Sequence, residues 1–341
     1  MSQILSPAAG STVFVLGRSR RVLRLVSVAA CLPYLALKIA WICGSRLGIP
    51  DGSPLLDHRL TMIVANGLTV LMDAGVIVLA LLLTRPWGLR MPGWLLAGPM
   101  WVATGLLAPI VAGYPLQLAV DALGGGAGGS SGGGGDEPFL DGWVFGVVYT
   151  GFIVQGLALG SLFVLYARDR WGHLWGGRVR EMPPADGRWA RFAVVVASLL
   201  ALFPAALHAL WAAGSTVGLG EARAGERTAD FHVLEALDVV YLAAAVGGAL
   251  VLVFRRLPAL PLPGLPGLPV RVPLATAWVG SGAVGCWGGW LLAASLTGPV
   301  DDLTGGPTRL MVLAYAVQMI TGLLVASAGA RFLRQRAGAT A

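Results

Sequence analysis

Long apolar segments alternate with short polar connections along most of the chain. Each segment has the roughly 20 residues that a helix needs to cross a bilayer core of about 30 Å. Helices are expected because lipid satisfies no backbone hydrogen bonds, and the segments lack the alternation of membrane strands. The pattern predicts eight spans: Val22–Cys43, Thr61–Thr84, Leu95–Val120, Trp143–Ala167, Ala190–Ala213, Val233–Phe254, Leu274–Thr297 and Leu310–Phe332.

The composition supports an integral membrane protein. Apolar residues make up 56% of the chain and charged residues only 12%, about half the charged share of a soluble domain. These values exclude a disordered chain, a small disulfide scaffold and an ordinary cytosolic enzyme. The cysteines Cys31, Cys43 and Cys286 are scattered, so they indicate neither a disulfide framework nor a zinc site.

The charges of the connections predict the orientation. One set of connections, which includes the N-terminus, holds 18 Arg and three acids, whereas the other set holds five Arg and eleven acids. We expect the protein in the plasma membrane, and the positive-inside rule predicts that both termini are cytoplasmic. The basic excess is thus an orientation signal, and we expect the lipid bilayer as partner and no nucleic acid.

The spans divide the chain into two halves of four. Two connections are of low complexity: a Gly-rich outer loop and a Pro-rich inner loop. The predicted organisation is an N-terminal cytoplasmic segment 1–21, a first four-span repeat 22–167 with the outer loop 122–137, a cytoplasmic linker 168–189, a second four-span repeat 190–332 with the Pro-rich loop 257–273, and a cytoplasmic tail 333–341.

Self-similarity supports this division into repeats. The string from Lys38 to Ile49 matches the string from His208 to Leu219 at an offset of 170 residues. Trp101–Gly105 in the third span likewise matches Trp278–Gly282 in the seventh. Because each repeat has four spans, an even number, both repeats begin on the same side of the membrane and cross it in the same direction. We therefore predict an all-α bundle of two parallel four-helix repeats, related by a pseudo-twofold axis along the membrane normal.

The repeated string has the form (Lys/His)-x-x-Trp-x-x-Gly-(Gly/Ser), here with Ser45 and Ser215 at the last position. This motif resembles the signature that follows the first span in uncharacterised four-span membrane proteins of high-GC actinobacteria. The excess of 23 Arg over one Lys is typical of a high-GC genome. The resemblance implies a membrane location and a four-helix unit, and it implies no activity.

Ionisable residues at membrane depth are the candidates for function, since each costs about 2.5–3.5 kcal/mol on insertion scales. One hypothesis is a vestibule that opens outward and binds a small polar ligand or an ion, or relays protons. Its predicted lining is Lys38, His208, Glu235 and Asp238, with Asp73 deeper and Asn66 nearby, flanked by Trp41 and Trp211. The alternative, which we favour, is structural: Lys38 snorkels to the interface or pairs with Asp73 or Asp238.

A metal site and an enzyme active site are not expected. His58, His208 and His232 are weak metal candidates on the outer side, but no HxxxH or HExxH spacing occurs. No nucleophile elbow, phosphate loop or Cys-x-x-Cys is present, so we predict neither catalytic residues nor a cofactor.

The residues therefore favour a structural, sensory or accessory membrane protein, to which a membrane or cytoplasmic protein could bind. A transporter or channel for a small solute is the alternative. A membrane-embedded enzyme acting on a lipid or quinone is the least favoured.

Overall fold

The computed structural model describes residues 17–53, 56, 59–123, 140–182, 188–225, 227–255, 267–297 and 306–340. Regular structure in these ranges is helical, apart from one antiparallel bridge between Arg178 and Pro269. The helices are α1 Arg18–Ile42, α2 Arg59–Leu82, α3 Gly93–Ala122, α4 Gly142–Trp171, α5 Arg188–Ala212, α6 Glu221–Gly225, α7 Ala229–Phe254, α8 Arg271–Thr297 and α9 Arg309–Thr340. Short 3-10 helices are η2 Pro86–Arg90, η3 Gly172–Leu174 and η4 Val179–Glu181.

The prediction of an all-helical protein with eight long apolar helices is confirmed. Within the described ranges, eight helices have the length and hydropathy to cross a membrane, and each contains most of one predicted span. The main difference is at the C-terminus, where α9 continues past the predicted end at Phe332 to Thr340. Most of the Gly-rich loop and much of the Pro-rich loop lie outside the described residues.

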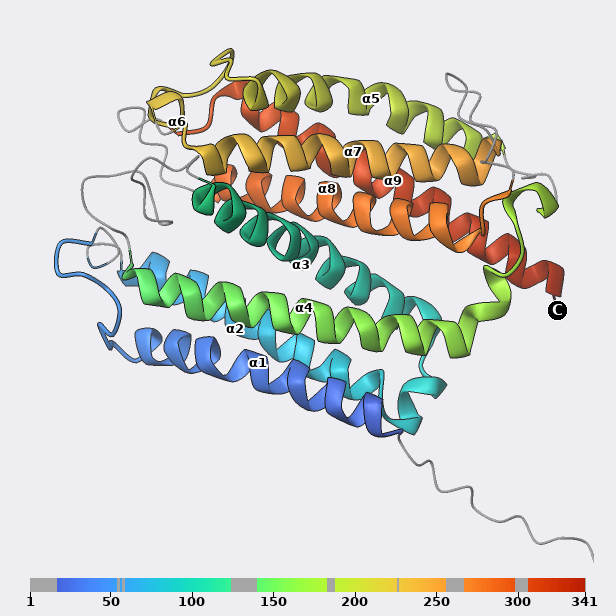
Figure 1. Ribbon diagram of the computed structural model, residues 1–341, viewed down its shortest axis with the longest axis horizontal. Helices are drawn as coiled ribbons and strands as arrows, with labels where there is room; N and C mark the ends of the chain where they lie inside the picture. Colours follow the sequence, from blue (N-terminus) through green and yellow to red (C-terminus); the bar gives the residue numbers. More distant parts are fainter. Residues whose placement is uncertain are drawn as a thin grey trace, which may run out of the picture.

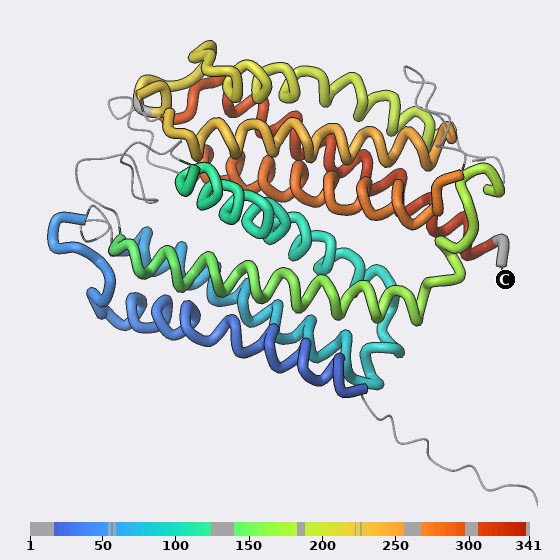
Figure 2. Tube along the Cα trace, in the orientation of Figure 1, coloured from blue at the N-terminus to red at the C-terminus, as the bar shows by residue number. Residues whose placement is uncertain are grey.

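The long helices form two groups, α1–α4 and α5 with α7–α9 (Figure 1). In the first group α1 packs against α2 and α4, and in the second α5 packs against α7 and α9. Within the first group, α3 lies on the side that faces the second group, where it contacts α8 and α7 (Figure 2). Helix α1 begins at the end of the bundle at which α9 finishes.

Small residues let α3 and α8 approach closely. A Cβ atom built on Gly105 would lie 2.5 Å from the carbonyl carbon of Gly282, so Gly105 has no room for a side chain; a Cβ on Gly282 would lie 3.1 Å from Gly105 Cα, a tight contact. Two hydrogen bonds flank this contact reciprocally, each from an indole to a hydroxyl of the facing helix. Trp101 Nε1 donates to Ser281 Oγ over 3.1 Å, and Trp278 Nε1 donates to Thr104 Oγ1 over 3.4 Å.

The two groups differ in how their second helix packs. Helix α7 packs closely against α8, where Gly280 meets the backbone of Tyr241 and Ala245. Helix α2, by contrast, packs mainly against α1 and makes far fewer contacts with α3. The looser packing of α2 leaves space between the groups.

Residues 168–171 of the predicted linker 168–189 continue α4, whereas residues 177–182 are folded onto the second group. Val179 N donates to Leu268 O over 2.9 Å, and Val270 N donates to Gly177 O over 3.1 Å. Val179 and Val270 are fully buried in a core with residues of α5, α7, α8 and α9. This segment is therefore an integral part of the second group.

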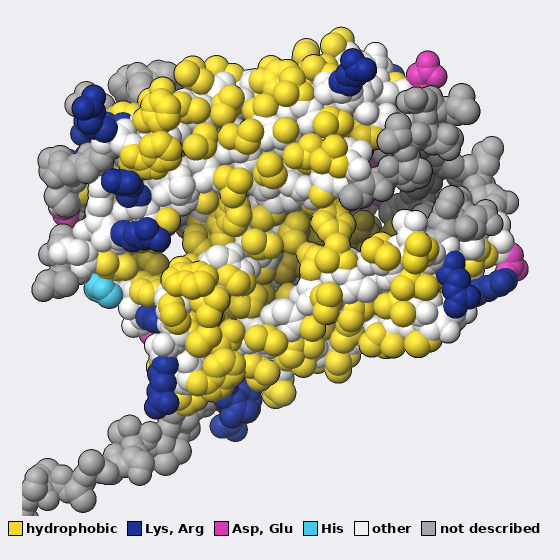
Figure 3. All heavy atoms as spheres, turned by 180° about the vertical axis from the view of Figure 1, so that it is seen from behind, with side chains coloured by type: hydrophobic (Ala, Val, Ile, Leu, Met, Phe, Trp, Pro, Cys, Tyr) yellow, Lys and Arg dark blue, Asp and Glu magenta, His cyan; other side chains and the backbone are white. Residues whose placement is uncertain are grey.

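The surface carries the pattern expected of a bilayer protein. Large apolar side chains are widely exposed on the long helices, as at Leu60, Leu71 and Leu199. Seen from behind, apolar atoms cover the middle of the molecule, while Lys and Arg gather mostly at the end where α1 begins (Figure 3).

Candidate functional site

The predicted polar residues form two separate groups, one in each half of the molecule. The first, which we call the Lys38 group, comprises Lys38, Asp73, Tyr34, Phe152 and Gln155 from α1, α2 and α4. Lys38 Nζ lies 2.8 Å from Asp73 Oδ2, and the two side chains are only 9% and 6% exposed. This is the pairing that the structural interpretation offered as one alternative.

Aromatic rings complete the surroundings of the ammonium group. Lys38 Nζ lies 4.9 Å from the ring centroid of Tyr34 and 5.5 Å from that of Phe152, within cation–π range. Tyr34 OH donates to Gln155 Oε1. Tyr34 precedes Lys38 by four residues, so the helical period placed it on the same face. This signal could have identified Tyr34 from the sequence.

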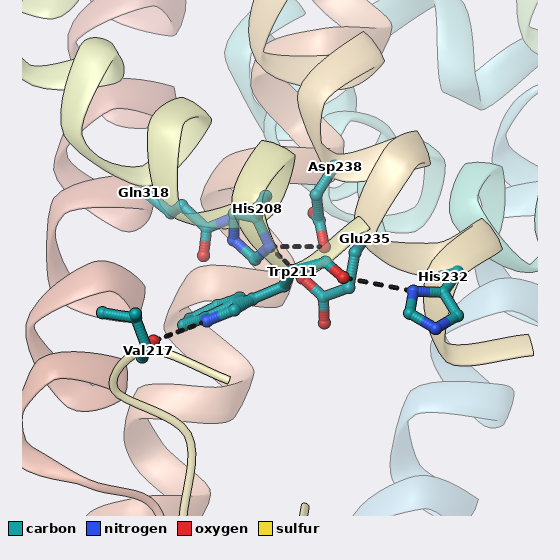
Figure 4. A network of polar contacts seen from close by, with 7 residues as sticks. All are labelled: His208, Trp211, Val217, His232, Glu235, Asp238 and Gln318. Atoms are coloured by element: carbon teal, nitrogen blue, oxygen red, sulfur yellow. Dashed lines mark hydrogen bonds and ion pairs between the residues drawn. The ribbon is translucent and has the colours of Figure 1, made fainter. Parts of the chain in front are cut away.

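The second set, the His208 group, comprises His208, Glu235, Asp238 and Gln318 from α5, α7 and α9 (Figure 4). His208 Nδ1 is hydrogen-bonded to Glu235 Oε2 and lies 3.7 Å from Asp238 Oδ2. Its Nε2 lies 2.9 Å from Gln318 Nε2. The helical spacing of three residues places both carboxylates on the face of α7 that meets α5.

A turn of the same conformation follows α1, which carries Lys38, and α5, which carries His208. Trp41 Nε1 donates to Leu47 O over 2.8 Å, and Trp211 Nε1 donates to Val217 O over the same distance. Both turns begin with a glycine in the left-handed region, Gly44 with φ +96° and Gly214 with φ +95°. The repeated Trp-x-x-Gly-Ser string thus codes for an indole that closes the loop at this end of α1 and α5.

The remaining predicted residues lie elsewhere. Asn66 donates to Met62 O of its own helix over 2.9 Å and belongs to neither group. His232 Nδ1 contacts Trp211 O over 3.1 Å and is turned away from His208 (Figure 4). His58 lies outside the described residues. Of the histidines named as weak metal candidates, the two that the structure describes, His208 and His232, have different partners.

An apolar cleft between the halves borders the Lys38 group. It has a volume of about 420 Å³ and lies between α2, α3, α4 and α8. The space-filling view shows an apolar hollow between the two halves of the molecule (Figure 3). Lys38, Asp73 and Gln155 contribute polar atoms to its wall, and most other lining residues are apolar: Met72, Val76, Leu79, Val102, Leu106, Leu107, Ile110, Trp287 and Trp290 among them.

A smaller pocket of about 270 Å³ lies between α6, α8 and α9, at the end of the bundle opposite the start of α1. Arg223, Ser295 and Tyr315 provide its polar lining. Sequence reasoning missed both spaces, since each depends on how helices distant in the chain pack together.

No protein-family model matches the chain, and no match was found among curated proteins or among solved structures.

Proposed function

We propose that the protein is a plasma-membrane protein with both termini cytoplasmic, built from two parallel four-helix repeats. The reciprocal bonds of Trp101 and Trp278 support this arrangement, because a twofold axis produces such paired contacts. The matched turns after Trp41 and Trp211 support it as well. The gathering of arginines where α1 begins and α9 ends supports the orientation.

Within this frame we propose a sensory or accessory role without catalysis, in which the protein binds an amphipathic lipid in the cleft beside Lys38. The carrying observation is an apolar space of about 420 Å³ at membrane depth, bordered by a buried ion pair. Its volume lies within the roughly 300–1,000 Å³ of small-molecule sites, and its wall combines apolar side chains with a few polar groups.

The chemistry of the wall selects the ligand class. Lys38 and Asp73 neutralise each other, so the cleft offers no net charge to an ion. A small polar solute would lose its hydration without enough partners, which costs several kcal/mol. A lipid with one long apolar chain and a neutral or zwitterionic polar group fits better. The chain fills the apolar space, and the polar group meets the Lys38 ammonium and the Asp73 carboxylate.

Gly75 provides the test, because it lines the cleft and a Cβ atom there would meet no atom within 4 Å. Gly75→Leu should therefore occupy part of the cleft without a clash. Gly67→Leu is the matched control, since Gly67 is on the same helix, has the same free space and does not line the cleft.

The measurement is native mass spectrometry of the protein released from a mild detergent, which counts the lipids that remain bound. Wild type and Gly67→Leu should retain one lipid per chain, and Gly75→Leu should lose it. Equal retention by both variants, or no retained lipid in the wild type, would overturn the proposal.

Transport of a small solute is the second candidate, favoured by the pocket of about 270 Å³ at the end opposite the start of α1. Arg223 could attract an anionic solute there. In proteoliposomes, transport would appear as a flux that Arg223→Ala lowers at least tenfold. Unchanged flux in that variant would exclude this pocket as the entrance.

A further inference from the structure

The His208 group brings three potential metal ligands of different residues together within the membrane. One ligand atom from each of His208, Glu235 and Asp238 lies within 4.8 Å of the others. His208 and Glu235 are buried, whereas the Asp238 side chain is 34% exposed. A common cation can therefore be held by protein atoms on one side and reached past Asp238 on the other.

Charge balance distinguishes this group from the Lys38 group. In the Lys38 group one ammonium faces one carboxylate, so the protein supplies its own cation. In the His208 group two carboxylates face one imidazole, and even a protonated imidazole would leave one negative charge in excess. An excess of this kind is relieved either by a proton on one carboxyl group or by a bound cation, and three ligand atoms within 4.8 Å of one another have the arrangement that a bound cation needs.

We propose that His208 Nδ1 and the carboxylates of Glu235 and Asp238 bind a divalent transition-metal cation of the zinc type. An imidazole nitrogen and carboxylate oxygens at about 2.0–2.2 Å are ordinary zinc ligands. His208 and Glu235 now bond each other directly, so the metal replaces the proton between them. A protonated imidazole releases its Nδ1 proton to solvent and keeps the proton on Nε2, whereas in a neutral imidazole the Nδ1 proton moves to Nε2. Three protein ligands leave a fourth position, which water fills from the Asp238 side.

Gln318 is the group that orients the histidine. A metal on Nδ1 fixes the remaining imidazole proton on Nε2, which must then donate to an acceptor. The Gln318 amide lies 2.9 Å from Nε2, and a half-turn of the amide presents its oxygen to that proton. A partner of this kind raises metal affinity about 10- to 100-fold.

The site goes beyond the proposed lipid-binding function, because it lies in the other half of the molecule and involves none of the cleft residues. The metal site would therefore remain possible if the cleft bound no lipid. The experiment measures zinc bound to the purified full-length protein by equilibrium dialysis and elemental analysis.

His208→Lys is the central variant, since it places an ammonium group beside Glu235, as Lys38 lies beside Asp73 in the other half. Asp238→Asn removes one ligand with little change of shape, and Gln318→Leu removes the orienting amide. His232→Gln is the matched control, because His232 is a nearby imidazole that contacts Trp211 O instead.

The wild type and His232→Gln should each bind one zinc ion per chain. This ion should bind more tightly than any zinc held by the carboxylates of the acidic connections. His208→Lys should abolish that ion and keep the thermal stability, Asp238→Asn should weaken binding at least tenfold, and Gln318→Leu about 10- to 100-fold. If His208→Lys fails to fold, the other two variants decide. A wild type without this ion, or variants that bind zinc as the wild type does, would overturn the proposal.

Discussion

Breaking the buried pair of Lys38 and Asp73 should destabilise the protein far more than removing it whole. At 2.8 Å and an effective dielectric constant of about 20, the attraction is about 6 kcal/mol. Desolvation of the two ions costs several kcal/mol each and offsets most of this gain. The net contribution of the pair is therefore small, but a single remaining charge would keep its desolvation cost without the attraction.

We expect Lys38→Met or Asp73→Leu alone to lower the free energy of unfolding by about 3–5 kcal/mol. The double variant should lie within about 2 kcal/mol of the wild type, because both charges leave together. The control is Asp169→Asn, which breaks a pair with Arg20 whose side chains are 23% and 47% exposed, and which should cost under about 1 kcal/mol.

The assay is unfolding in mixed detergent and dodecyl sulfate, followed by a thiol-reactive dye. Cys31 is fully buried and becomes reactive only on unfolding, and it is the reporting thiol once the exposed Cys43 and the partly exposed Cys286 have been replaced by Ser and Ala. Single variants that each lose less than 1 kcal/mol would refute the reasoning. So would a double variant whose loss equals the sum of the two single losses.

Three further predictions concern the fold. Gly105→Leu should destabilise the contact between the halves by about 3 kcal/mol or more, because its Cβ meets the backbone of Gly282, whereas Gly98→Leu meets open space and should be tolerated; similar melting temperatures would contradict this. Arg170→Ala should lower the free energy of unfolding by about 3 kcal/mol, since its guanidinium donates to the carbonyl oxygens of Gly88 and Met91, the latter over 2.6 Å. Arg168→Ala is the control and should have a small effect, and an equally small effect of both variants would contradict the prediction. Cys43 is exposed just after the end of α1, so with the proposed orientation a membrane-impermeant maleimide should label it in intact cells, and labelling only after lysis would reverse the orientation.

The spans could be predicted from the sequence because each depends on local hydropathy. Pairing of Lys38 with Asp73 was one of two alternatives, since both lie at membrane depth and isolated charges there are costly. The choice between Asp73 and Asp238 depends on which helices are neighbours, and that information is not local. The hypothesis of a single vestibule depended on the same non-local information. In the structure, Lys38 and Asp73 lie in one group, and His208, Glu235 and Asp238 lie in the other.

The cleft could not be anticipated, since it results from a difference in packing. Gly280 on α8 allows close contact with α7, whereas α2 contacts α3 at few positions. Hydropathy treats α2 and α7 alike, because the mean hydropathy of their most apolar stretches is similar, 2.0 and 2.3. The folding of Val179 and Met182 onto the second half was hidden for a similar reason, as the polar residues around them indicate a linker.

The most direct test of the lipid-binding cleft uses Trp287, which lines it and donates to Leu106 O of α3 over 3.3 Å. In nanodiscs with brominated acyl chains, the contribution of Trp287 to the fluorescence is the difference between the wild type and Trp287→Phe. Brominated chains should quench this contribution strongly, and Gly75→Leu should relieve the quenching whereas Gly67→Leu should not. Quenching that is absent from the wild type, or equal in the two glycine variants, would contradict the proposal.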